Sequence, residues 1–344
     1  MSRGLWTMVS ISAMLHFLVD GLCISCMYTV AYPFDIPRLA TVFMTYNVLA
    51  FLTQPLTGAI ADKARNGQWM LWTAVALLSM AVVAANIATI GSATTGDAVA
   101  TGDATTAGSS GTLRPSWTML MVVASLLGMG NSLFHVWGGR LTAVSTGNDI
   151  RALGVFVATG ALGLSVGMLL YSWTTVSIML VLLVGLAAME TKSLNSLTPS
   201  PSPRRESLTP AREVGGEAVG LLVLIMLFVM LRSFVGSIFT GGLGKTETIV
   251  LAIGLVAMLG KMGGGWIAKG LGLWRGAALM VLITVGCLLL QQWGTPVLFI
   301  GLFAINCTMP VTLYLANTLL KGHEGLAFGL LAATLMPGYL MAML

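Results

Sequence analysis

Hydrophobic residues fill most of this chain in long runs, each about as long as the apolar core of a lipid bilayer is thick. A helix needs about 20 apolar residues to cross that core, and eleven stretches of the chain are of this kind. They cover residues 5–30, 39–61, 69–91, 117–136, 152–171, 174–189, 218–240, 246–268, 274–291, 296–320 and 326–344. The pattern therefore predicts an all-α membrane protein with about eleven spans.

The composition agrees with this prediction. Hydrophobic residues make up 56% of the chain and charged residues 8%, and the mean hydropathy is +0.91. A soluble globular protein has no use for so much apolar surface. The first run is too long, and too polar at its centre, for a removable signal peptide, so we expect it to remain as a span.

Two polar segments interrupt the apolar runs. Residues 92–116 are rich in Gly, Ala, Thr and Ser and predict a flexible external loop. Residues 191–217 contain four prolines and charges of both signs, which is typical of a cytoplasmic linker. Because this linker follows six spans, we expect a six-helix bundle over residues 1–190 and a second bundle over 218–344. We count five spans in the second, so we expect either that the given sequence lacks the twelfth helix of a symmetric pair or that this is a short form whose C-terminus lies outside.

The basic residues indicate the orientation. With the N-terminus in the cytoplasm, twelve Lys and Arg residues lie inside, three outside and two within spans. Loops rich in Lys and Arg stay on the cytoplasmic side, so we expect a multi-pass protein of the inner membrane with a cytoplasmic N-terminus. The net charge of +5 follows from this bias and carries no inference about nucleic acid. We expect a monomer.

Ionisable residues inside apolar runs are costly and mark polar pathways through membrane proteins. Asp20 lies in the first run, and His16 is one helical turn before it, so the two share a face and can exchange a proton. Arg232 lies at a similar depth in the seventh run. Its charge persists at any accessible pH, so it suits either an anionic substrate or the neutralisation of Asp20.

Further polar residues could line a central cavity. Asn131 and His135 share a face of the fourth run, and either a cavity stripe or ordinary packing explains them. Lys261 lies near the inner end of its run, where we expect its amine to reach the lipid phosphates instead of a substrate. The remaining candidates, each equally explained by a hydrogen bond between helices, are Asn47, Gln54, Asn306, Tyr314 and Asn317.

Three motifs occur in order: HFLVDG at 16–21, QPLTGAIADK at 54–63 and GMGNSLFHVWGGR at 128–140. Together they resemble the fosmidomycin-resistance branch of the major facilitator superfamily. The resemblance implies two six-helix bundles around a central substrate site. The chain departs from the pattern at Val136-Trp137, where relatives often have Pro followed by an acidic residue, and this affects the identity of the substrate.

The second motif also resembles the inner latch of that superfamily. Gly58 would let two helices approach closely, Asp62 would cap a helix N-terminus on the inner side, and Lys63 would lie among the lipid phosphates. Arg140, which closes the third motif, completes the gating residues that the resemblance implies. The alternative is that these charges only anchor a short loop.

The sequence contains no phosphate-binding loop in its proper context, no metal-ligand cluster and no catalytic triad, so we expect neither an enzyme nor a cofactor or metal. The expected function is secondary active transport, namely proton-coupled export of a small organic solute, with the buried arginine favouring an amphiphilic anion. The expected partners are this solute, protons and the lipid bilayer. A facilitator or importer, and a sensor or scaffold that transports nothing, remain alternatives.

Overall fold

The computed structural model describes residues 1–31, 36–64, 67–95, 116–197 and 216–342, and these are almost entirely helical. Ten helical stretches of the described residues are long and apolar enough to cross a membrane, and two of these, Pro37–Lys63 and Glu324–Met341, each consist of more than one helix. The apolar helix Leu273–Leu289 is shorter. The helices are α1 (Arg3–Ala31), α2 (Ile36–Asn47), α3 (Gln54–Lys63), α4 (Gln68–Thr95), α5 (Trp117–Ser145), α6 (Ile150–Leu169), α7 (Trp173–Leu197), α8 (Gly216–Leu243), α9 (Glu247–Leu271), α10 (Leu273–Leu289), α11 (Thr295–Leu319), α12 (Glu324–Ala333) and α13 (Leu335–Met341). The predicted all-α membrane architecture is confirmed.

Two of the predicted spans are broken helices. A π-helical turn, η1 (Val48–Leu52), separates α2 from α3. Pro55 lies in the first turn of α3, where a missing backbone N–H does no harm. The last span divides at Thr334 into α12 and α13. Hydropathy alone cannot locate such breaks, because the residues on both sides are equally apolar.

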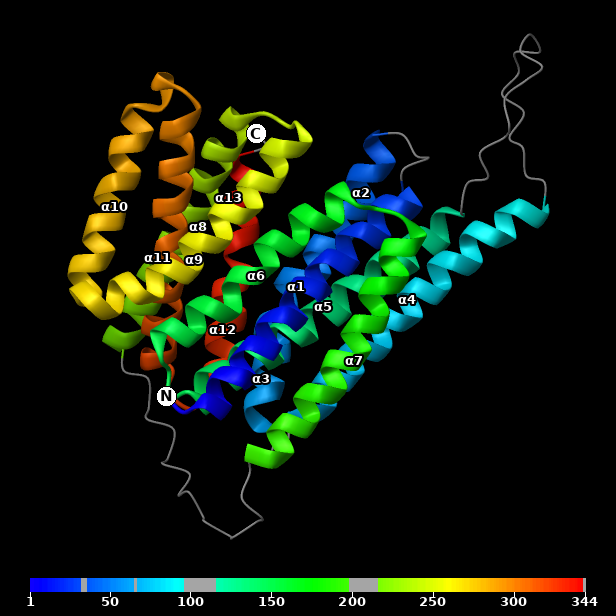
Figure 1. Cartoon of the computed structure of the whole chain (residues 1–344), viewed down its shortest axis with the longest axis horizontal. Helices are drawn as coiled ribbons and strands as arrows, with labels where there is room; N and C mark the ends of the chain where they lie inside the picture. Colours follow the sequence, from blue (N-terminus) through cyan, green and yellow to red (C-terminus); the bar gives the residue numbers. More distant parts are fainter. Residues whose placement is uncertain (32–35, 65–66, 96–115, 198–215, 343–344) are drawn as a thin grey trace.

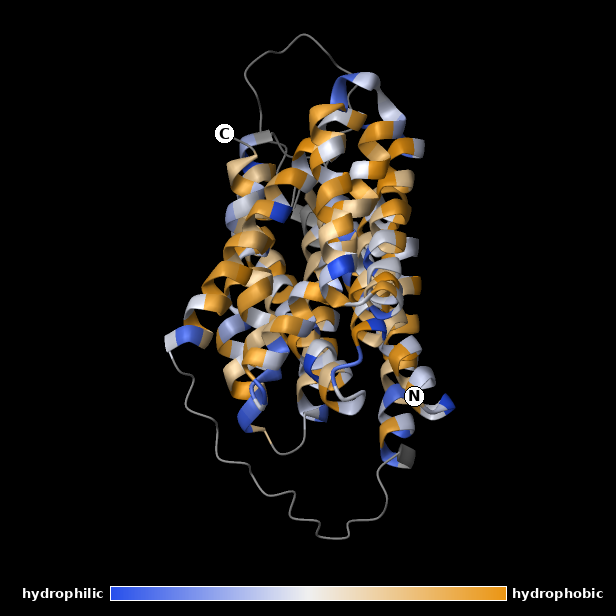
Figure 2. Cartoon of the chain, turned by 90° about the vertical axis from the view of Figure 1, so that its left-hand side faces the viewer, coloured by the Kyte–Doolittle hydropathy of each residue, from blue (hydrophilic) through white to orange (hydrophobic). Residues whose placement is uncertain are grey.

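The helices form two bundles (Figure 1). In the first, α1 packs against α5, α6 and α7, and α4 packs against α5; in the second, α11 packs against α8, α9 and α10. The bundles meet along two seams, one between α6 and α9 and the other between α3 and α12. Apolar residues cover much of the helical surface, as lipid contact requires (Figure 2).

Both predicted polar segments begin later than expected, because the preceding helices continue. The helix α4 extends to Thr95, and the rest of the predicted loop, 96–115, lies outside the described residues. Likewise α7 extends to Leu197 and α8 begins at Gly216, so most of the predicted linker also lies outside them.

The seam between α3 and α12 depends on glycine. A Cβ atom at Gly58 would overlap the backbone carbonyl of Gly325 on the facing helix. The backbones therefore touch directly, which is the close approach predicted for Gly58.

Candidate functional site

A cavity of about 550 Å³ lies between the two bundles. Its walls are largely apolar and aromatic, with a few polar groups, as is typical of a small-molecule site. The polar and charged lining residues are His16, Asp20, Tyr28, Tyr46, Asn47, Gln54, Asn131, His135, Arg232, Ser233, Lys261, Thr312 and Tyr339. Tyr28 near the end of α1 and Tyr339 near the end of α13 show that the cavity reaches toward the face opposite the N-terminus.

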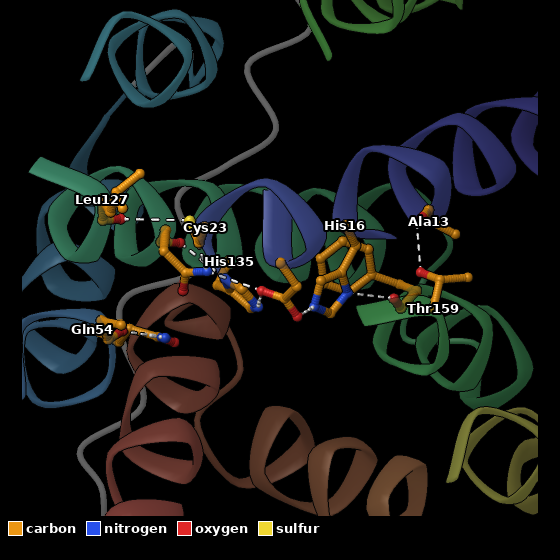
Figure 3. Close-up of polar contacts among 11 residues, drawn as sticks. Ala13, His16, Cys23, Gln54, Leu127, His135 and Thr159 are labelled. Carbon is orange, nitrogen blue, oxygen red and sulfur yellow. Dashed lines mark hydrogen bonds and ion pairs between the residues drawn. The ribbon is translucent and has the colours of Figure 1, made fainter. Parts of the chain in front are cut away.

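Three side chains converge on one carboxylate in this cavity. Nε2 of His16 lies 3.3 Å from Oδ2 of Asp20, and Nε2 of His135 lies 3.5 Å from Oδ1. The side-chain amide of Asn131 donates to Oδ1 at 2.9 Å. His16 and His135 (Figure 3) thus contact different oxygens of the carboxylate, and their rings pack edge to face with centroids 4.5 Å apart. Asp20 itself is buried with 7% of its surface exposed.

The backbone determines the tautomer of both imidazoles. Nδ1 of His16 lies 2.7 Å from the carbonyl oxygen of Phe156, and Nδ1 of His135 lies 2.9 Å from that of Asn131. A carbonyl oxygen only accepts, so each Nδ1 must carry the hydrogen. A neutral imidazole would then direct a lone pair at the carboxylate, and the contact is attractive only when Nε2 is protonated.

The cluster His16–Asp20–His135 is therefore built to hold a positive charge. The atoms that could bind a cation, one from each of the three side chains, all lie within 4.8 Å of one another. A proton on either imidazole is therefore shared with the same carboxylate. A divalent metal ion is the other cation that could occupy this space. The sequence predicted the His16–Asp20 pair, which lies on one helix, but gave His135 only as a candidate for the lining of a substrate cavity.

Arg232 does not pair with Asp20. The ion pairs of Asp20 within the described residues are those with the two histidines. Arg232 lines the cavity with 7% of its surface exposed, and its Nη1 has no hydrogen-bond partner in the described part of the chain. A buried guanidinium without a partner is costly, and an anion would satisfy it.

Lys261 also lines the cavity. Its charge interacts with those of Arg232 and Asp20, so the side chain points inward and not to the lipid phosphates as expected. Position near the end of a hydrophobic run could not reveal this, because the direction depends on how α9 is rotated against α6.

The other predicted substrate residues fall into two groups. Asn47 and Gln54 line the cavity, and Oε1 of Gln54 has no partner among the described residues. Asn306, Tyr314 and Asn317 are not part of the lining. The amide of Asn306 donates to the Leu302 carbonyl of its own helix at 2.8 Å.

Tyr314 and Asn317 instead hold the turn between α5 and α6. The side chain of Asn148 donates to the Tyr314 carbonyl at 3.1 Å and accepts from the Asn317 amide at 3.0 Å. Asn148 has a positive φ of 60°, which Asn tolerates better than most residues. These bonds connect the two bundles on the face where the chain starts, which we call the near face.

A second connection on the near face involves Asp62. Its carboxylate accepts from the backbone N–H groups of Gly325 and Leu326, both at 2.8 Å, and from Nε of Arg140 at 3.1 Å. A carboxylate at a helix N-terminus satisfies otherwise unpaired donors and the helix dipole. The carboxylate of α3 thus caps α12 of the other bundle, while Lys63 is exposed.

No protein-family model matches the sequence, and no curated protein matches it significantly. The structure is similar to the crystal structure of a variant of FucP, the fucose:proton symporter of E. coli. The TM-score is 0.62 at 12% identity, and the match covers 99% of this chain and 91% of that one. The chain therefore has the two-bundle fold of the major facilitator superfamily, and this match gives no support for the fosmidomycin-resistance branch.

Proposed function

We propose that this protein is a secondary active transporter that moves a small organic anion across the inner membrane, coupled to protons. One observation carries the proposal: the cluster His16–Asp20–His135 and Arg232, whose Nη1 has no hydrogen-bond partner among the described residues, face the same cavity between two bundles. Ionisable groups at this depth are rarely without a function. The likeness to a fucose:proton symporter supports transport at the level of the fold.

The closed near face supports alternating access. Asp62 and Asn148 connect the bundles there, while the cavity reaches toward the opposite face. With the orientation that the basic residues predict, the near face is cytoplasmic. We propose that this is the outward-facing state and that breaking the near-face contacts opens the cavity inward.

A sensor or scaffold without transport is the alternative. Such a protein would have no need for charged groups buried around an apolar cavity, because each of them destabilises the fold unless a ligand or partner compensates. Arg232 with its unpartnered Nη1 therefore favours a transported ligand.

Flux in proteoliposomes tests this proposal. We expect a panel of radiolabelled aromatic and aliphatic carboxylates to include one whose flux depends on an imposed proton gradient and disappears with a protonophore. The Asp20→Asn variant keeps the size of the side chain but cannot titrate, so it should lose gradient-driven accumulation while anion exchange partly remains. Flux that vanishes after EDTA treatment would point to a metal ion in place of the proton. Wild-type vesicles that move none of the anions, neutral analogues or cations would favour the sensor.

A further inference from the structure

We infer that the anion and the proton bind this cavity cooperatively, with Arg232 and Lys261 forming the anion site, so that the protein is a symporter of protons and an amphiphilic anion. This inference rests on the proposed function and adds to it the anion site and the sign of the coupling. The sequence led us to expect export, whereas cooperative binding implies uptake driven by the proton gradient.

The second bundle supplies the anion site. Arg232 comes from α8 and Lys261 from α9, and both line the cavity. Nη1 of Arg232 is buried and lacks a partner among the described residues, so a donor stands ready for an oxyanion. Apolar side chains of the same cavity, including Met309 and Leu335, would accept the body of an amphiphilic molecule.

The lining carries an excess of positive charge. With both imidazoles neutral, Arg232 and Lys261 are opposed by the single carboxylate of Asp20 among the lining residues. Each proton taken up by His16 or His135 adds one further positive charge to the same cavity. An anionic ligand compensates this excess, whereas a cationic ligand would add to it.

The proton site belongs to the first bundle. The titratable and charged groups around Asp20 are His16 and Cys23 on α1, Tyr46 on α2, His135 on α5, Arg232 on α8 and Lys261 on α9. From α6, Gly160 faces the carboxylate and has nothing to titrate, and Glu190 on α7 accepts from Ser12, two turns away from Asp20 along α1. Tyrosine and cysteine are ordinarily neutral at neutral pH. The two histidines are the groups of this set whose ordinary pKa lies between about pH 5 and 8.

Opposite charges in one low-dielectric cavity attract, so each ligand strengthens the binding of the other. Linkage makes this reciprocal: if protonation tightens anion binding by some factor, anion binding tightens proton binding by the same factor. Couplings between sites are typically about 5- to 150-fold. A carrier whose two ligands bind cooperatively is mostly either empty or loaded with both the proton and the anion. An inward proton gradient then drives the anion inward.

Antiport would instead require that the solute and the proton compete for binding. A cation that bound at Asp20 would displace protons from the cluster, and its transport would run opposite to theirs. The sign of the pH effect on binding thus separates symport of an anion from antiport of a cation.

The test uses 2-naphthoate, an aromatic carboxylate, with 2-naphthamide as the uncharged analogue of the same shape. Binding to the full chain in lipid nanodiscs is measured at about pH 6 and about pH 8, where a carboxylate stays ionised and histidine titrates. We expect naphthoate affinity to be about tenfold higher at the lower pH, with proton uptake from a weakly buffered solution on binding. Naphthamide should show neither effect.

Variants connect the effect to the named residues. Arg232→Gln should lose naphthoate binding at both pH values, and Lys261→Gln should weaken it, with thermal unfolding reported alongside. If Arg232→Gln does not fold, Arg232→Lys keeps the charge without the planar fork and should bind more weakly while retaining the pH effect. The double variant His16→Gln, His135→Gln should still bind naphthoate, but equally at both pH values.

Two contrary results have different meanings. Binding that depends on Arg232 but is tighter at high pH, or that releases protons, would overturn the symport and leave the proposed transport of an anion intact. If neither naphthoate nor phenyl phosphate bound in an Arg232-dependent way, the anion site itself would be wrong, and gradient-driven flux of cationic or neutral solutes would show whether the transporter proposal survives.

Discussion

Gly160 of α6 lies directly against Asp20 of α1, so closely that a methyl group at position 160 would overlap the carboxylate. The same methyl group would also overlap Nε2 of His16. From the sequence, Gly160 belongs to a row of small residues suited to helix packing. In the structure this glycine makes room for the charged cluster itself, because any larger residue would push the carboxylate out of position.

The Gly160→Ala variant should therefore weaken the proposed coupling between proton and anion. We expect it to remove most of the pH dependence of naphthoate affinity, since Asp20 and His16 can no longer occupy their positions together. The control is Gly236→Ala, where no atom lies within 4 Å of the added methyl group; it should behave as wild type. A Gly160→Ala protein with a full pH effect would show that the cluster tolerates displacement.

Comparison with the sequence shows which relationships are local. The His16–Asp20 pair could be predicted because four residues in a helix put two side chains on one face. His135 reaches the same carboxylate only because α5 packs against α1, and nothing in the spacing of the chain shows this. Apolar length predicts the spans, but it says little about the rotation of each helix, which decides whether Lys261 or Asn306 faces the cavity.

The near-face connection at Asp62 should control access to the cavity. Asp62→Asn keeps the shape of the side chain but loses its charge and one of its acceptor oxygens, so the closed near face should be destabilised by about 1 kcal/mol. Thr57 is partly buried on α3, between Gln54, which lines the cavity, and Asp62. We expect a cysteine introduced at Thr57 to react faster with a thiol reagent in this background. Lys63→Gln, at an exposed position, is the control. An unchanged labelling rate would mean that Asp62 only anchors its loop.

The contribution of the Asn148 side chain to stability can be measured separately from that of its backbone conformation. In the Asn148→Gly variant, glycine adopts the positive φ of 60° without strain, but the hydrogen bonds to Asn317 and Tyr314 are lost. We expect a loss of about 1 kcal/mol in the stability of the closed state. In a double-mutant cycle with Asn317→Ala the two losses should not add, because both variants remove the same contact; additive losses would contradict the pairing.

The ion pair at the start of α6 makes a prediction about pH. Hydrogen bonds from the Arg151 guanidinium lower the pKa of Asp149, and the hydrogen bond from the Arg151 backbone N–H lowers it further. A lowered pKa contributes stability that is complete above the ordinary carboxyl pKa of about 4 and is lost as pH falls through the folded value. Asp149→Asn retains a helix cap, so thermal unfolding of the variant should vary less with pH across this acidic range than that of the wild type. Parallel wild-type and variant curves would remove Asp149 from the acid response.

The orientation can be tested at two exposed lysines on opposite faces. Lys245 lies between α8 and α9, and Lys321 lies between α11 and α12 on the near face. Because Lys and Arg concentrate on the cytoplasmic side, we expect an impermeant thiol reagent to label Lys245→Cys in intact cells and Lys321→Cys only after permeabilisation. The four native cysteines are buried, so the unsubstituted protein serves as the background. The reverse labelling pattern would invert the membrane orientation, and with it the direction in which the proposed symport runs relative to the open side of the cavity.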